Sequence, residues 1–165
     1  MRTWSPYAML GILFGLRPRP ACVTDDFTMA LDSSWVARHE ETHYGFARDG
    51  DADQVTVSAH KNQRSLDQPT LLVAALDLVG IRQQAFQTIS QGTIACSALE
   101  KRNAGGGVDV SFVAADSAGH IQCRVWVLAR PGRIVTLTYN RYPPLLSSAA
   151  FQQQANIIRA AVTVR

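Results

Sequence analysis

The sequence predicts a mixed α/β (α+β) fold in which two main helices cover a mostly antiparallel sheet. The first observation behind this prediction is the period-two alternation of apolar and polar residues over much of residues 94–139. The second is the helical spacing of apolar residues in two segments, about 69–89 and 147–162. The third is size, because 165 residues of which 47% are hydrophobic and 18% charged suffice for one core.

The first elements are a short strand and a hairpin. Residues 27–31 alternate and end at a turn over residues 32–34, after which Trp35 is expected to pack onto the core. Two further alternating runs, 43–47 and 54–60, flank an acidic turn over residues 49–53. A calcium loop starting there would need Gly and Glu where Gln54 and His60 stand, so we predict a solvated turn.

A long helix and four strands follow. The helix opens within residues 66–70, with Pro69 near its first turn, and runs to about residue 89. Its apolar residues close to helical spacing are Leu72, Leu76, Val79 and Phe86. The strands are predicted at residues 94–99, 108–114, 121–129 and 134–139. Short connections that contain glycine favour antiparallel neighbours.

The last helix is predicted over about 147–162, because apolar residues recur there on one face: Phe151, Ala155, Ile158 and Val162. On the strand 121–129 the odd positions form one apolar face, but Trp126 and Leu128 make the opposite face apolar as well. Something must therefore cover both faces, and the two helices lie either one on each side of the sheet or both on one side.

Two of the three cysteines are expected to be buried free thiols. A meander places one strand between those that carry Cys96 and Cys123, which separates them by about twice the ~4.8 Å strand spacing. That distance exceeds the Cα separation of most disulfides, which is below ~6.8 Å. The third cysteine, Cys22, lies in the N-terminal segment.

The charge balance argues against a nucleic-acid partner. The formal net charge is +3, but residues 1–21 contain three arginines and no acid. The remainder holds 13 basic and 13 acidic residues, without a basic stripe.

Residues 1–22 are predicted to be a signal-like leader or a disordered extension, and residues 26–165 a single domain. Arg2 precedes an apolar run over residues 7–16 of the length found in signal peptides, and Cys22 follows a small residue as in bacterial lipoproteins. These features predict a protein of the periplasm or cell envelope, with a lipid on Cys22 as its only route to the membrane. The alternative is a cytoplasmic protein whose start codon is misplaced.

The motif H-E-x-x-H, formed by His39, Glu40 and His43, allows a second interpretation. On a helix the two imidazoles would share a zinc ion and Glu40 would activate its water, as in a zinc metallopeptidase. Against this, Glu41 adds a charge beside the metal, Gly45 weakens the helix, and no third ligand stands in a recognisable motif. We therefore predict no metal, and zinc peptidase is the alternative.

The order of elements resembles the PsbP-like fold. The residues that carry the resemblance are 27–35, 54–58 and 133–139, although bacterial members usually have Pro-Gly before the tryptophan where this chain has Ser33-Ser34. The resemblance implies an α/β/α sandwich. It also implies a non-catalytic module that binds another protein, as adaptors and immunity proteins of bacterial secretion systems do. In agreement, no nucleophile–base pair or phosphate loop is visible, and residues 105–107 lack the Lys and Ser/Thr of a P-loop.

The partner-binding residues predicted from the sequence are Tyr142, Leu145 and Leu146. Pro143 and Pro144 hold this connection extended near the surface, which makes the three apolar side chains a preorganised contact patch. The alternative is that the leucines only fix the start of the last helix to the core.

Overall fold

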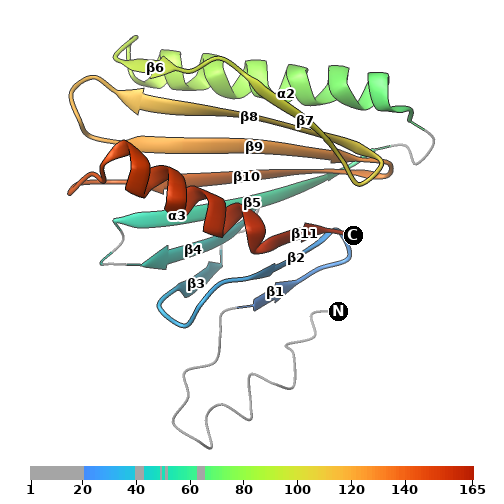
Figure 1. The fold of residues 1–165 in the computed structure, drawn as a ribbon, viewed down its shortest axis with the longest axis horizontal. Helices are drawn as coiled ribbons and strands as arrows, with labels where there is room; N and C mark the ends of the chain where they lie inside the picture. The colour runs from blue at the N-terminus through green and yellow to red at the C-terminus, as the bar shows by residue number, and fades with distance from the viewer. Residues whose placement is uncertain (1–20, 40–42, 49, 51, 63–65) are drawn as a thin grey trace, which may run out of the picture.

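The computed structural model describes residues 21–39, 43–48, 50, 52–62 and 66–165 (Figure 1). Its main sheet has eight strands in the order β3-β4-β5-β10-β9-β8-β6, with β7 also paired to β8. All neighbours are antiparallel. The strands are β3 (Val36–His39), β4 (Tyr44–Arg48), β5 (Asp53–Lys61), β6 (Ile94–Cys96), β7 (Glu100–Ala104), β8 (Gly107–Asp116), β9 (Gln122–Arg130) and β10 (Arg133–Arg141).

One helix lies on each face of this sheet, which confirms the α/β/α sandwich and settles the alternative left open by the sequence. In Figure 1, α3 (Ser148–Ala160) crosses in front of β9, β10 and β5, whereas α2 (Gln68–Ile89) runs alongside β8 and β6. The alternation along β9 separates two cores. Val125 and Val127 face α2, and Trp126 and Leu128 lie in the core under α3.

Helix α2 begins where the sequence predicts. The carboxylate of Asp67 caps it by accepting a hydrogen bond of 2.9 Å from the backbone N–H of Thr70. Of the predicted face, Val79 is buried, whereas Leu72, Leu76 and Phe86 are only half-buried. The other buried residues of the helix are Leu71 and Ala75. Alanine at position 75 brings the helix close to β8, which the hydrophobicity pattern alone does not reveal.

Helix α3 agrees with the prediction more closely. The hydroxyl of Ser147 caps it by accepting from the backbone N–H of Ala150. Its buried residues are Phe151, Ala155 and Ile158, as expected. Trp35 is 3% exposed and lies in the same core, which confirms its predicted packing.

A second sheet was not predicted. Strand β2 (Phe27–Ala30) lies between β1 (Ala21–Val23) and β11 (Val162–Val164), so that both ends of the described chain join one sheet (Figure 1). The predicted strand 27–31 is therefore present. Residues 21–23 precede the domain boundary predicted at residue 26, yet they pair with β2.

The connection between β7 and β8 is shorter than expected. The sequence predicts a glycine-bearing loop over residues 103–107, but residues 100–104 form β7 and the turn consists of Gly105 and Gly106. Glu100, Lys101 and Arg102 are exposed, as charged residues on an edge strand usually are. The strand was missed because it has no apolar alternation.

Cys96 of β6 and Cys123 of β9 both pair with Ala114 of β8, on its two opposite sides. One strand therefore separates them as predicted, and both thiols are free. Burial raises the pKa of both thiols. Among the described helices, neither is long and apolar enough to cross a membrane.

Candidate functional site

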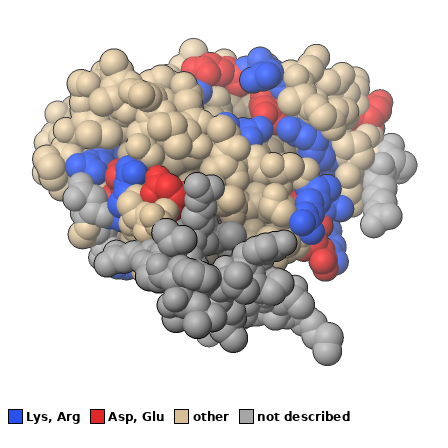
Figure 2. Space-filling view, turned by 60° about the horizontal axis from the view of Figure 1, so that its bottom comes forward, with Lys and Arg blue, Asp and Glu red and all other residues tan. Residues whose placement is uncertain are grey.

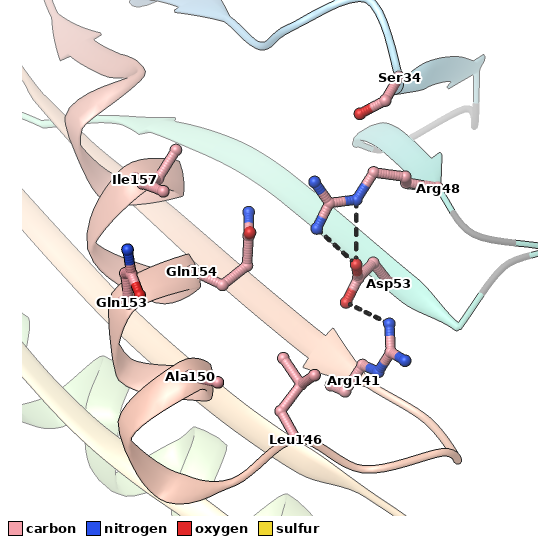
Figure 3. Close-up of a pocket in the computed structure, with 9 residues that line it drawn as sticks. All are labelled: Ser34, Arg48, Asp53, Arg141, Leu146, Ala150, Gln153, Gln154 and Ile157. Carbon is pink, nitrogen blue, oxygen red and sulfur yellow. Dashed lines mark hydrogen bonds and ion pairs between the residues drawn. The ribbon is translucent and has the colours of Figure 1, made fainter.

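A groove of about 840 Å³ runs between α3 and the ends of β4, β5 and β10 (Figure 3). We call it the α3 groove. Its volume lies in the range typical of binding sites, and its lining combines charged, amide and aliphatic side chains. It is lined by Ser34, Arg48, Asp53, Arg141, Leu146, Ala150, Gln153, Gln154 and Ile157.

The floor of the α3 groove is an ion network that strand register assembles. Asp53, the first residue of β5, lies opposite Arg48 on β4 and opposite Arg141 on β10. Arg48 donates from Nε and Nη2 to Oδ2 of Asp53, at 3.0 and 2.6 Å. Nη1 of Arg141 lies 3.2 Å from Oδ1. The adjacent ends of β4, β5 and β10 thus place one carboxylate between two guanidinium groups.

The buried Tyr139 of β10 is the fourth member of this network. Its hydroxyl donates a 2.7 Å hydrogen bond to Oδ1 of Asp53, which is 2% exposed. Burial by itself raises the pKa of Asp53, but the hydrogen bonds from Tyr139 and the two arginines bring it below the usual value. Burial, and then the bond to Asp53, raise the pKa of Tyr139. The pair therefore remains a carboxylate and a neutral phenol near neutral pH.

Each arginine is held in place by a further contact. The guanidinium carbon of Arg48 lies 4.6 Å from the ring centroid of Trp35, in a cation–π arrangement. Nε of Arg141 donates a 2.8 Å hydrogen bond to the carbonyl of Pro144. The cationic floor is therefore preorganised, and it is connected directly to the segment that joins β10 to α3.

The wall of the α3 groove is the outward face of α3. Gln153 and Gln154 provide amide groups, and Ile157 is 53% exposed although it is a large aliphatic residue. Leu146 closes the end of the groove. Its backbone is held by the side chain of Gln122, which donates to the carbonyl at 2.9 Å and accepts from the N–H at 3.1 Å.

The predicted partner-binding residues lie at this end of the groove, although only one lines it. Leu146 lines the groove and is partly buried against the core under α3. Tyr142 and Leu145 are half-buried. The backbone N–H of Tyr142 donates to the carbonyl of Ala52 at 2.7 Å, which ties the segment to the residue before β5. Burial raises the pKa of Tyr142.

The H-E-x-x-H motif does not lie on the helix that the zinc interpretation requires. Residues Val36–His39 form β3, and His39 is paired with Tyr44 of β4. Glu40 lies outside the described residues. His43 lines a different cavity, on the face of the sheet that carries α2. No group of three potential metal ligands occurs among the described residues. The helical arrangement expected for the alternative reading is therefore wrong for residues 36–39.

Two other sequence expectations can be placed. Cys22, the predicted lipidation site, is the middle residue of β1, where it pairs with Met29 and is half-buried. Asp53, which the sequence assigned to a solvated turn, is instead buried in the ion network. Sequence reasoning missed Arg48 and Arg141 for the same reason, since their meeting depends on the register of two strand pairs.

Charged groups elsewhere also occur as local pairs. Asp109, for example, lies 2.7 Å from both Arg130 and Arg159. On the face shown in Figure 2, acidic and basic atoms lie in small mixed groups separated by uncharged surface.

Comparison with known proteins identifies a structural neighbour. No family model matches the sequence, and no curated protein matches it. Among solved structures, cyanobacterial PsbP from Synechocystis is similar, with a TM-score of 0.67 and 14% identity over 89% of this chain and 91% of that one. A protein of Bacteroides thetaiotaomicron matches with a TM-score of 0.42 and 16% identity, over 84% of this chain and 45% of that one. The chain therefore has the PsbP-like fold that its order of elements resembles.

Proposed function

We propose that this protein is a non-catalytic module that binds another protein through the α3 groove and the adjoining Tyr142, Leu145 and Leu146. The observation that carries the proposal is the make-up of the groove. A fixed pair of guanidinium groups lies beside an exposed aliphatic wall, and arginine and aromatic side chains are enriched at the energetic centres of protein interfaces.

The chemistry of the floor favours recognition over catalysis. Both oxygens of Asp53 are engaged and its side chain is almost fully buried, so the groove presents guanidinium rather than carboxylate. A partner segment that combines an acidic side chain with an apolar one fits this surface. The acid would lie toward Arg48, which is 22% exposed, and the apolar side chain against Ile157.

The biological setting remains a proposal of the same kind. The PsbP-like fold and the signal-like character of residues 1–22 support a role in a bacterial cell envelope or secretion system, as an immunity protein or an effector adaptor. The periplasm is the proposed compartment, and the cytoplasm is the alternative.

A photo-crosslinking amino acid at position 157 tests the proposal in the native host. We expect a discrete crosslinked product with one protein, which mass spectrometry identifies. The control carries the same amino acid at position 89, because Ile89 is 82% exposed on α2, away from the groove. Absence of a product at 157, or the same product at both positions, would contradict the proposal.

Affinity for the identified partner then tests individual side chains. Ile157→Glu and Tyr142→Ala are each expected to weaken binding about tenfold or more, as truncation at an interface centre does. Ile89→Glu should bind normally. The Tm of Ile157→Glu should stay close to that of the wild type, because its side chain is exposed. Lost stability in Tyr142→Ala without weaker binding would mean that this segment serves packing alone.

A further inference from the structure

A second cavity, of about 490 Å³, lies on the opposite face of the main sheet from the α3 groove. We call it the α2 cavity. Hydroxyl, amide and imidazole groups dominate its lining, which is unusual for the inner face of a sheet. It is lined by His43, Thr56, Ser58, His60, Arg82, Phe86, Val125, Thr136, Thr138 and Asn140.

The floor of the α2 cavity is a set of cross-strand hydroxyl pairs between β5 and β10. Thr56 lies opposite Thr138, and Ser58 lies opposite Thr136, which is 3% exposed. Helix α2 packs mainly over β8 and β9, and its core contains the apolar side chains of those two strands. The polar part of the face therefore lies beside the helix, where it forms a recess instead of a core.

One acceptor in this recess has no donor among the described residues. Oδ1 of Asn140 is buried and makes no hydrogen bond with any residue that the structure describes. A buried polar atom without a partner is destabilising, so native proteins seldom keep one unless a ligand or water supplies the missing group. Because Asn140 lines the cavity, a small shift of its side chain would bring this acceptor within reach of a ligand that donates a hydrogen bond.

The charge that lines the α2 cavity is positive and comes from Arg82. Arg82 lines the cavity from α2, is exposed, and makes no ion pair with any residue in the described part of the chain. No Asp or Glu is among the described residues that line the cavity. Phe86, which packs edge-on against Phe112 with ring centroids 6.2 Å apart, gives the recess an apolar side.

We propose that the α2 cavity binds a small organic anion that carries hydroxyl groups. The anionic group would lie toward Arg82, and the hydroxyl groups would exchange hydrogen bonds with Thr56, Ser58 and Thr138. One of them would donate to Oδ1 of Asn140. This site is separate from the α3 groove, so the proposal is tested independently of the protein-binding proposal.

Backbone amide spectra of the isotope-labelled full chain test the proposal, with glucose phosphate and citrate as hydroxylated anions. We expect both to shift the amide signals of residues 56, 58, 136 and 138 in a saturable manner. Glucose and inorganic phosphate, added alone, each lack one half of the recognised chemistry and should bind more weakly by about tenfold. No saturable shift with either anion would overturn the proposal. Equal affinity for glucose would show that the charge contributes nothing, and equal affinity for inorganic phosphate would show that the hydroxyl groups contribute nothing. Either result would contradict the proposed class of ligand.

Two variants and one control assign the site. Arg82→Gln is expected to weaken binding of the hydroxylated anions about tenfold, whereas Arg102→Gln removes the same charge from the exposed strand β7 and should change nothing. Asn140→Leu should weaken binding about three- to tenfold without lowering the Tm, because the lost acceptor has no donor among the described residues. Equal losses in the two arginine variants would show unspecific charge attraction and contradict the assignment.

Discussion

Replacement of Asp53 by alanine is expected to lower the free energy of unfolding by about 3 kcal/mol, because removal of one partner from a buried ion pair leaves the other uncompensated. Here the loss would leave two guanidinium groups facing each other, and the buried hydroxyl of Tyr139 without its acceptor. Chemical denaturation followed by circular dichroism measures the change. The matched control is Asp77→Ala on the exposed side of α2, which should change stability by no more than about 0.5 kcal/mol.

The same carboxylate predicts a pH dependence. The pKa of Asp53 is lower in the folded protein than in the unfolded chain, so its contribution to stability is present above the unfolded value of about 3.9 and is lost as the pH falls through the folded value. The stability difference between the wild type and Asp53→Ala should therefore shrink below about pH 4. A difference that is small at neutral pH, or that grows in acid, would show that the network does not hold these strands together.

Replacement of Phe151 by alanine is expected to cost about 3–5 kcal/mol, as truncation of a buried aromatic residue does. Phe151 is 4% exposed and stacks on Tyr139, with ring centroids 5.1 Å apart. It thus joins α3 to the residue that bonds Asp53, and its loss should loosen the wall of the α3 groove together with the floor.

Ile157→Ala is the control for this change, since it lies on the same helix but faces solvent. We expect its stability to stay within about 0.5 kcal/mol of the wild type. Because Phe151 and Asp53 act through a shared neighbour, Tyr139, the effects of Phe151→Ala and Asp53→Ala should not be additive. Additive effects would mean that α3 and the ion network are independent.

Much of the fold could be predicted because it rests on local patterns. The alternation over residues 54–60 and 121–129 marks strands that bury one or both faces, and the spacing of Phe151, Ala155 and Ile158 marks the buried side of α3. These patterns are set by each segment alone. The structure changes their bounds by only a few residues.

The elements that were missed depend on distant partners. Strand β11 has three residues and forms only by pairing with β2, from the other end of the chain. Strand β7 is polar because it lies at an edge, and β3 has no alternation to distinguish it from a turn. Such strands are recognised by the neighbour they pair with, and a single sequence does not reveal that neighbour.

The candidate site was predicted only at its margin. Leu146 could be found because an apolar side chain in a proline-bearing connection is conspicuous. The floor of the α3 groove could not be predicted, since Arg48, Asp53 and Arg141 meet only when β4, β5 and β10 pair in one register. A one-residue shift of either pair would turn the side chains to the other face.

The zinc content of the full-length protein, purified without chelators and passed through gel filtration, tests most directly whether this is a binding module or a zinc peptidase. Because residues Val36–His39 form a strand, His39 and His43 lack the one-turn helical spacing by which this motif binds zinc. We therefore expect far less than one zinc ion per chain. About one tightly held zinc ion per chain, lost when His39 and His43 are replaced by alanine, would contradict it and favour the peptidase.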